Sequence, residues 1–486
     1  MSVLAQSVSY SYVVFIIFTI LYVLTILGLI GVVISENRNP VKSLAWVAVL
    51  ILLPVLGVFL FLLFGRSLKG VRMISRRKSN KLLGDVANEK IDLDQTGIND
   101  ESKQIARLVN SIVEPHFFTG NEIEIFTSGQ EKFDALKRDM LAAKEYIHLQ
   151  YYIFARDKIG REIRDILVQK AQEGVKVRVI YDHIGSFLLN MSFFRKMRKA
   201  GVEAYPFLKV TIMEFANRLN WRNHRKMVII DGKVGYIGGM NIADRYVTGS
   251  KHKLKHKQPW RDTHLRIVGN ALKGLQYSFA VDWNFMKRDL LTETTATYNA
   301  APDAPDAMQI VSSGPTGRWN AISHVFLKAI ANAKRSVFIQ TPYFLPTDGL
   351  LKVLQSAALA KIDVRLMVPR TPDSRLLKYS SYSYIKECLQ AGIKVYFYEN
   401  TMMHSKCVIV DDEFVTTGST NFDFRSFEHN FECNVMVYSK QFNERMKRIF
   451  MADLKNCTRI ILPHWRRRPA QQRVLESLAR LMSPIL

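Results

Sequence analysis

Two short segments of the 486-residue chain carry the same set of chemically active side chains. His224, Lys226 and Asp231 form one H-x-K-x4-D pattern, and the same pattern returns later as His404, Lys406 and Asp411. Each copy runs, at the same offset, into a Gly-x-x-Asn group that ends at Asn241 in the first copy and at Asn421 in the second. At ordinary residue frequencies one such pattern arises by chance in about a few per cent of chains of this length. Two copies with the same trailing group are therefore a signal and not a coincidence.

The residue types in this motif suit the binding of a phosphodiester. Histidine and lysine two positions apart on a strand point to the same side, so each copy presents an imidazole beside an ammonium. The small residues before Asn241 and Asn421 let the backbone approach a phosphate. Two lysines, two asparagine amides and two histidines can bind one phosphodiester and neutralise the charge of its transition state. A lone histidine is usually a satisfied core residue, but the duplicated frame argues against that interpretation here.

The two aspartates of the motif have a separate interpretation. Asp231 and Asp411 each follow an apolar strand and are followed by Gly232 and Asp412, so they stand where the chain turns into its next strand. We interpret them as residues that fix the turn, with a role as proton carriers as the alternative.

The motif lies within a longer internal repeat. The segment from Ile147 to Phe154 resembles the segment from Val337 to Phe344, and each is followed by a helical stretch and then a short β-branched strand. Strands that alternate with helical stretches predict βαβ units with helices on both faces of a sheet. The predicted fold class is therefore α/β, with two similar domains that pack about a pseudo-twofold axis.

Composition and hydropathy predict the boundaries of the parts. We expect a membrane hairpin at 1–65, a basic juxtamembrane segment and linker at 66–105, a first half at 106–291, a linker at 292–307 and a second half at 308–486. The motif occupies 224–241 in the first half and 404–421 in the second.

The N-terminal part is predicted to span a membrane twice. The chain is uncharged from Tyr12 to Ile34 and again from Leu44 to Phe64, and about 20 apolar residues cross the hydrocarbon core as a helix. A basic cluster follows the second run, from Arg66 to Lys81, whereas the short segment between the runs has two basic residues. The positive-inside rule then places everything after Phe64 in the cytoplasm.

Charge and cysteine content limit the partners and the compartment. The net charge is +25, which indicates an anionic partner, either nucleic acid or an acidic membrane surface. The four cysteines form no CxxC pair and predict neither a zinc site nor a disulfide framework.

Two further basic segments stand out. Residues 251–257 read Lys-His-Lys-Leu-Lys-His-Lys, which we interpret as a basic loop that faces acidic headgroups, with a metal site at His252 and His256 as the alternative. The C-terminal segment, from Trp465 to Met482, has the pattern of a basic amphipathic helix, which either lies on the bilayer or packs on the protein.

The duplicated motif resembles that of the phospholipase D superfamily. The N-terminal hairpin, the segments Gln340–Phe344 and Trp260–Leu265, and the polar pattern from Asn421 to Glu432 resemble those of bacterial cardiolipin synthases. This resemblance extends over nearly the whole chain.

The resemblance implies a two-step reaction without a metal or other cofactor. One histidine attacks phosphorus to form a phosphohistidine, and the other protonates the leaving alkoxide and then activates the incoming alcohol. The family places His224 as the nucleophile and His404 as the general acid and base, although pseudo-symmetry leaves the choice open. It also implies that Glu432 and Asp262 orient the histidines, and that the hydroxyl of Ser419 binds the phosphate with Asn241 and Asn421. The first half departs from the family pattern because Gly239 replaces the hydroxyl residue.

The function implied is cardiolipin synthesis: one phosphatidylglycerol donates its phosphatidyl group to another, and glycerol leaves. The partners implied are phosphatidylglycerol and anionic membrane lipids, with no nucleic acid, and the location implied is the bacterial inner membrane, multi-pass, with the catalytic domains on the cytoplasmic side. A membrane phospholipase D, or a phosphatidyltransferase that uses another alcohol, is the alternative. A nuclease is a further alternative, but the membrane hairpin argues against it.

Overall fold

A computed structural model describes residues 2–35, 40–53, 55–65, 68–83, 92–113, 117–186, 191–209, 220–249, 258–286, 289–291 and 304–483. The chain divides into two compact units, one of residues 1–67 with 210–220 and one of residues 68–209 with 221–486. The basic loop at 251–257, with His252 and His256, lies outside the described residues, as does most of the predicted linker at 292–307.

The N-terminal unit is helical. Its elements are α1 (Ser2–Ser35), α2 (Pro40–Leu52), α3 (Leu56–Leu60) and the π-helical turn η1 (Phe61–Gly65). Among the described residues, α1 is the one helix long and apolar enough to cross a membrane, with a mean hydropathy of 2.9 over Tyr12–Ser35. The side chains of Ile26, Val33, Leu50 and Phe61 form the small buried cluster of this unit. The long apolar helix that the sequence predicts at this place is therefore present.

The second predicted membrane helix is not one continuous helix. The helix α2 ends at Leu52, Val55 has a left-handed φ of 62°, and α3 begins after it. The sequence has proline at position 54, and proline has no amide hydrogen to donate within a helix. The hydropathy of the run from Leu44 to Phe64 correctly indicates an apolar segment, but it does not register this interruption.

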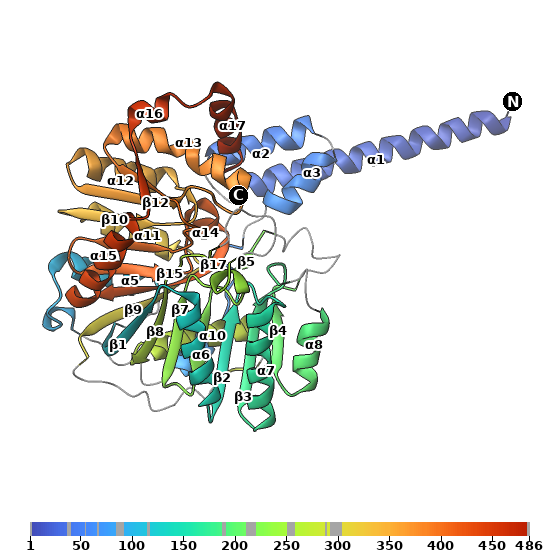
Figure 1. Cartoon of the computed structure of the whole chain (residues 1–486). Helices are drawn as coiled ribbons and strands as arrows, with labels where there is room; N and C mark the ends of the chain where they lie inside the picture. Colours follow the sequence, from blue (N-terminus) through green and yellow to red (C-terminus); the bar gives the residue numbers. More distant parts are fainter. Residues whose placement is uncertain are drawn as a thin grey trace. The chain divides into compact units, whose positions relative to one another are not determined.

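The larger unit is built on one mixed sheet, which has 16 strands among the described residues (Figure 1). The first half contributes the order β1-β8-β7-β6-β2-β3-β4. These strands are β1 (Phe118–Phe126), β2 (Tyr146–Tyr151), β3 (Lys176–Asp182), β4 (Glu203–Phe207), β6 (Met227–Ile230), β7 (Val234–Gly238) and β8 (His264–Gly269). The helices of this half are α6 (Gly129–Leu141), α7 (Lys158–Gln172), α8 (Met191–Lys199) and α10 (Leu272–Phe285), with a short 3-10 turn η6 (Asp244–Tyr246).

The second half repeats the same order as β9-β17-β15-β14-β10-β12-β13 and adds the edge strand β18. These strands are β9 (Asp306–Ser313), β10 (Ser336–Gln340), β12 (Asp363–Pro369), β13 (Lys394–Tyr398), β14 (Cys407–Val410), β15 (Phe414–Gly418), β17 (Asn430–Tyr438) and β18 (Cys457–Ile460). Its helices are α11 (Ala321–Ala331), α12 (Asp348–Leu359), α13 (Arg375–Ala391), α14 (Phe424–Glu428), α15 (Lys440–Leu454), α16 (Leu462–Arg466) and α17 (Ala470–Leu481). A separate two-stranded sheet joins β11 (Phe344–Leu345) to β16 (Phe422–Asp423).

The two halves meet through their equivalent first strands. The strands β1 and β9 pair antiparallel, with Phe118 opposite Met308 and Asn121 opposite Asp306. Because the same strand of each half forms the junction and the two run in opposite directions, the halves are related by a pseudo-twofold axis. The predicted α/β fold of two similar domains is confirmed.

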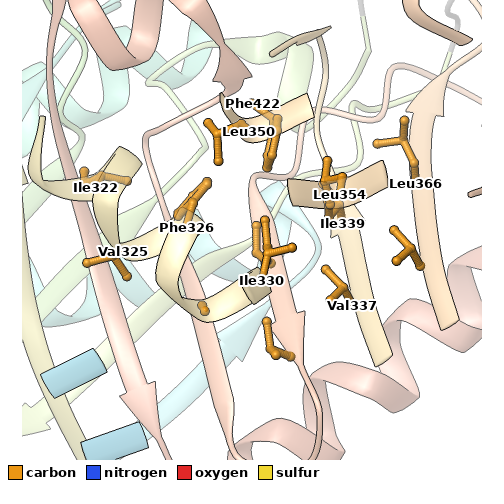
Figure 2. Close-up of a cluster of buried hydrophobic side chains, with 14 of the residues drawn as sticks. Ile322, Val325, Phe326, Ile330, Val337, Ile339, Leu350, Leu354, Leu366 and Phe422 are labelled. Carbon is orange, nitrogen blue, oxygen red and sulfur yellow. The ribbon is translucent and has the colours of Figure 1, made fainter. Parts of the chain in front are cut away.

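Local sequence explains the elements that carry the motif. The strands β6 and β14 consist of Met227–Ile230 and Cys407–Val410, both rich in β-branched residues that favour extended structure. The core of the second half places α11 and α12 against β10 and β12, with residues such as Phe326, Ile330 and Leu354 buried between them (Figure 2).

One helix belongs to a different half from the one predicted. The helix α5 (Asp100–Ile112) falls across the expected boundary at 105/106, in the linker and the first half. Its residues Ile105, Ala106 and Val109 are buried in the core cluster of the second half. The amide of Asn99 also donates to the Glu413 carboxylate at 2.8 Å. The remaining short elements of this unit are α4 (Arg76–Leu83), the 3-10 turn η3 (Leu93–Gln95) and β5 (Arg222–Asn223).

Candidate active site

The two motif histidines stand where the halves exchange backbone hydrogen bonds. The short strand β5, directly before His224, pairs with the start of β17 in the other half (Figure 1). An equivalent bridge joins Arg261 to Met403, directly before His404. The amide of His224 donates to the carbonyl of Phe431 at 2.9 Å, and the amide of His404 donates to the carbonyl of Arg261 at 2.7 Å. Each histidine is thus fixed to the opposite half.

The carboxylate partners of the histidines also come from the opposite half. The Nδ1 atom of His224 lies 2.9 Å from Oε1 of Glu432, and the Nδ1 atom of His404 lies 2.6 Å from Oδ2 of Asp262. Both carboxylates are fully buried. A carboxylate on Nδ1 fixes the ring orientation and leaves Nε2 as the reactive nitrogen. The structure therefore pairs the four residues that the sequence analysis singled out, and it pairs them across the halves.

The two lysines lie beside their own histidines. The Nζ atom of Lys226 donates to the carbonyl of His224 at 2.5 Å. The Nζ atom of Lys406 donates to the carbonyl of His404 and lies 2.8 Å from its Nδ1 atom. Both ammonium groups are buried, and the two lysines stand directly before β6 and β14, not within a strand as the sequence predicted.

The asparagines that follow the motif are held by different partners in the two halves. Asn241 accepts from the amide of Ile153 at 3.1 Å, and its Nδ2 donates to the Tyr246 hydroxyl at 3.2 Å. Nδ2 of Asn421 donates to Asp423 at 2.9 Å, and its buried Oδ1 has no hydrogen-bond partner among the described residues. An amide nitrogen carries two hydrogens, so each asparagine retains one donor for a ligand.

The hydroxyl of Ser419 is bound to a carboxylate. Its Oγ donates to Oε2 of Glu432, and Asn430 donates to Oε1 of the same carboxylate at 3.2 Å. In the first half, a Cβ atom at Gly239 would lie 2.1 Å from Oδ1 of Asp262. The two halves therefore fill the same space differently, with serine beside the longer glutamate and glycine beside the shorter aspartate.

The two motif aspartates bind backbone amides. Asp231 accepts from the amides of Lys144, Glu145 and Tyr146 at 2.8–2.9 Å. Asp411 accepts in the same way from Lys334, Arg335 and Ser336 at 2.8–2.9 Å. Each carboxylate thus fixes the entry into the neighbouring strand, β2 or β10. This geometry suits the turn-fixing interpretation, and it assigns these carboxylates to the backbone amides and not to the histidines.

Burial sets the protonation of the site. Desolvation lowers the pKa of His224 to about 4; the Glu432 carboxylate opposes this shift and the Lys226 ammonium reinforces it. Desolvation lowers the pKa of His404 to about 4 as well, reinforced by Lys406 and opposed by Asp262. It also lowers the pKa of Lys226 to about 7, and it lowers that of Lys406. Without a ligand the histidines are therefore neutral at neutral pH.

Sequence analysis missed a set of buried ion pairs beneath the histidines. Arg225 pairs with Asp282 on α10, which also accepts from Gln150 at 2.5 Å. Arg261 of the first half binds Asp453 on α15 of the second half at 2.7 Å, and Asp453 also accepts from Gln340 at 2.8 Å. The recurrence of Gln150 and Gln340 at equivalent places in the repeat was a signal for this network. The arginines gave no such signal, because Arg225 and Arg261 both lie in the first half, at positions that the repeat does not relate to each other.

Aromatic rings complete the surroundings of the histidines. Tyr152 lies edge-on to His224 with ring centroids 5.0 Å apart, and Trp260 lies 5.2 Å from His404. The hydroxyl of Tyr246 lies 3.4 Å from Nδ1 of His404. In the described part of the chain, there is no group of three or more histidine, cysteine or acidic residues that could hold a metal ion.

Comparison with known proteins identifies the family. Residues 136–253 and 326–454 match the family model described as cardiolipin synthase, PLD-like domain, and residues 20–66 match the model of the phospholipase D-nuclease N-terminal segment. Cardiolipin synthase 2 of Bacillus cereus is 39% identical over 94% of this chain and 89% of its own length. The major cardiolipin synthase ClsA of Bacillus subtilis is also 39% identical, over 94% of this chain and 96% of its own length.

A solved structure shares the fold. The crystal structure of phosphatidylserine synthase from Haemophilus influenzae aligns with 80% of this chain and 100% of its own, with a TM-score of 0.59 and 16% sequence identity. The duplicated motif, the paired halves and the sequence matches over most of the chain agree with one another. The chain belongs to the family of cardiolipin synthases with two phospholipase D-like domains.

Proposed function

We propose that the protein is a cardiolipin synthase that transfers a phosphatidyl group from one phosphatidylglycerol to a second and releases glycerol. The observation that carries this proposal is the pair of buried histidines, each oriented by a carboxylate of the opposite half and flanked by a lysine. Such a site has one nucleophile, one proton carrier and positive charge for one phosphodiester. The membership of the chain in the cardiolipin synthase family supports the choice of substrate.

In the first proposed step Nε2 of His224 attacks phosphorus. A bond forms between nitrogen and phosphorus, and the bond between phosphorus and the headgroup glycerol oxygen breaks. His404 gives its proton to that oxygen, so glycerol leaves as a neutral alcohol. Lys226, Lys406, Asn241 and Asn421 stabilise the charge on the phosphoryl oxygens. Ser419 acts through Glu432, whose carboxylate its hydroxyl holds.

In the second proposed step the glycerol hydroxyl of another phosphatidylglycerol takes the place of the leaving group. His404, now neutral, removes its proton while the oxygen attacks phosphorus. The phosphohistidine bond breaks and cardiolipin forms. Similar alcohols leave and enter, so the reaction is close to thermoneutral and reversible.

The proton on His404 arrives with the substrate. A pKa of about 4 leaves this histidine neutral in the empty site at neutral pH. A bound phosphodiester anion favours the charged imidazolium and raises the pKa. The site therefore takes up the proton that the leaving alcohol needs when the anionic lipid binds.

We further propose that the protein is a multi-pass protein of a bacterial cytoplasmic membrane, with the catalytic unit on the cytoplasmic side. The helix α1 provides one crossing. The second is proposed for the uncharged run from Leu44 to Phe64, whose 21 residues are enough to cross a hydrocarbon core of about 30 Å as a helix. Such a crossing requires this run to open, because in the structure α3 and η1 fold back beside α2, with the rings of Trp46 and Phe61 5.4 Å apart. The basic residues from Arg66 to Lys81 favour the cytoplasmic side for the rest of the chain.

Product analysis tests the proposed function. Phosphatidylglycerol in mixed micelles should give cardiolipin and glycerol in equal amounts, and added glycerol should drive cardiolipin back to phosphatidylglycerol. Phosphatidic acid as the main product at high lipid density, with no effect of glycerol, would identify a phospholipase D instead. A phosphatidyl ester of another added alcohol, formed in preference to cardiolipin, would identify a different phosphatidyltransferase.

A further inference from the structure

The C-terminal helix α17 is packed with its polar side against the protein. Glu476 is 2% exposed and Ala479 is 5% exposed, although these residues belong to a strongly basic segment. Arg468 binds the Glu476 carboxylate at 2.6 Å, and Gln472 donates to it at 2.8 Å. An acidic side chain therefore lies under the helix, where amphipathic helices of soluble proteins usually bury apolar side chains.

The contacts of α17 with α13 are also polar. Oγ of Ser380 donates to the carbonyl of Ala479 at 2.8 Å and lies 2.9 Å from Oγ of Ser483. Arg480 pairs with Glu387, and its guanidinium lies 4.4 Å from the ring of Tyr384. These bonds fix the rotation of α17 about its own axis, so the face that points outward is determined.

The outward face is apolar. Val474 is 58% exposed, Leu478 is 56% exposed and Leu481 is 77% exposed, at intervals of four and three residues that keep them on one face. Leu475 and Met482 flank them and are exposed as well. A contiguous apolar stripe on an otherwise charged surface marks a contact with a partner or a membrane.

The charge around this stripe identifies the partner. From Cys457 to the C-terminus the chain has arginine at 459, 466, 467, 468, 473 and 480, and the single acidic residue is Glu476. That acid is buried and paired with Arg468, so it contributes little to the outer surface. A helix with an apolar face, flanked by arginines that have no exposed acidic neighbour in the segment, suits an anionic lipid surface.

We propose that α17 is an interfacial helix by which the catalytic unit docks onto an anionic bilayer. Val474, Leu478 and Leu481 enter the boundary between headgroups and acyl chains, and the neighbouring arginines bind lipid phosphates. This inference deepens the proposed function and rests on it in one respect, because that function places the substrate in the bilayer.

The docking surface is connected to the active site through α13. Ser380, which holds the end of α17, lies six residues after the N-cap Ser374, or about 9 Å along the helix. Asp373, directly before that cap, is among the carboxylates that act on His404. Leu376, one turn before Ser380 on α13, is also an apolar side chain that is 42% exposed. Docking through α17 would therefore bring the bilayer to the side of the unit from which α13 leads to His404.

A polarity-sensitive fluorophore tests the docking surface in the full-length protein. The label is attached to cysteine in the variant Leu478→Cys, with Cys457→Ser to remove the most accessible of the native thiols, since the other three are buried. The matched control carries the label at Arg161→Cys, an exposed position on α7 of the first half. Both proteins are reconstituted into vesicles of phosphatidylcholine with phosphatidylglycerol, with and without quenchers attached to the acyl chains.

We expect the label at position 478 to shift to shorter wavelength and to be quenched by the lipid-borne quencher several-fold more than the label at position 161. The effect should weaken in phosphatidylcholine alone and at high salt, because the arginines supply part of the attraction. A label at 478 that stays in water while the same vesicles make cardiolipin would overturn this inference and leave the proposed function intact. Equal quenching in vesicles without phosphatidylglycerol would refute the proposed preference of α17 for an anionic surface. A shift that appears in detergent and follows protein concentration would identify a contact between two copies instead.

Negative charge placed on the apolar face of α17 allows a functional measurement. The variant Leu478→Glu with Leu481→Glu should keep its rate in mixed micelles and lose most of its rate in phosphatidylglycerol vesicles. The control Ser477→Glu, at the flank of the same helix, should keep its rate in both. An unchanged rate of the double variant in vesicles would contradict the proposal.

Discussion

At the scale of single residues, the site depends on carboxylates that reach the histidine of the other half. The sequence predicted that Glu432 and Asp262 orient histidines, but the pattern within each half gave no reason to pair them crosswise. That pairing follows from the way in which β5 joins β17 and Arg261 joins Met403. Contacts between halves depend on their packing, and packing does not appear in the spacing of a motif.

The orienting carboxylates give the first prediction. The substitution Glu432→Gln should lower kcat by on the order of 10³-fold with a small effect on KM, because the imidazole loses the partner that fixes its tautomer. Asp262→Asn should have an effect of similar size through His404. Glu428→Gln changes a nearby glutamate that binds Asn320 and should leave the rate within a few-fold of wild type. A normal kcat in Glu432→Gln would contradict the crossed pairs.

The difference between Gly239 and Ser419 gives a second prediction. Gly239→Ser adds a Cβ atom that would lie 2.1 Å from Oδ1 of Asp262, so Asp262 must move and His404 loses its alignment. We expect a loss of activity of at least about 10²-fold, comparable with loss of the carboxylate itself. Ser419→Gly removes one hydrogen bond to Glu432 and should cost about tenfold or less. Equal losses in the two variants, measured by kcat, would refute this account of the asymmetry.

The lowered histidine pKa values give a third prediction. Short-chain phosphatidylglycerol should bind the His224→Ala variant with a larger proton uptake, by up to about one proton, than the His224→Ala, His404→Ala double variant at pH 7. The sign follows from the site: His404 is neutral when empty, with a pKa of about 4, and the bound anion raises that pKa. Affinity should therefore fall as the pH rises through the raised value. Calorimetry in buffers of different ionisation enthalpy measures the uptake, and equal uptake in both variants would exclude His404 as the proton carrier.

At the scale of helices and strands, the duplicated pattern predicted the order of elements well. The repeat correctly indicated β2 and β10, the helices after them, and the hairpins that carry the motif. The sequence pattern did not predict three features of the structure. The interruption between α2 and α3 lies within an apolar run of uniform hydropathy. The helix α5 precedes the first half but packs on the core of the second, and the amphipathic helix α17 turns its apolar side outward. Periodicity identifies the apolar face of a helix but not the surface that this face meets.

The motif aspartates give a prediction at this scale. Asp411→Asn replaces one acceptor oxygen by an NH2 group that faces a backbone amide, either that of Lys334 or those of Arg335 and Ser336. The free energy of unfolding should fall by about 1–3 kcal/mol, while the folded variant keeps most of its kcat. The neighbouring Asp412→Asn changes a half-exposed pair with Lys447 and should cost less than about 1 kcal/mol. A large loss of kcat at unchanged stability would instead assign Asp411 to the chemistry.

At the scale of the whole catalytic unit, the two halves form one sheet and one site. The β1–β9 junction, the crossed histidine–carboxylate pairs and the Arg261–Asp453 ion pair all join one half to the other. Duplication explains why the site has two histidines, two lysines and two asparagines. The crossed contacts bring the two copies of the motif together to act on one substrate. Each motif histidine depends on the other half for its orienting carboxylate.

Mapping the covalent intermediate tests this account most directly. Wild-type protein and the variants His224→Ala and His404→Ala are mixed with phosphatidylglycerol labelled in its acyl chains, stopped under alkaline denaturing conditions and analysed by mass spectrometry. We predict at most one phosphatidyl group per chain, attached to His224 in the wild type, and no adduct on His404 when His224 is absent. Both variants should lose turnover. An adduct on His404 in the His224→Ala variant, or turnover without any adduct on histidine, would contradict a single shared site with one nucleophile and one proton carrier.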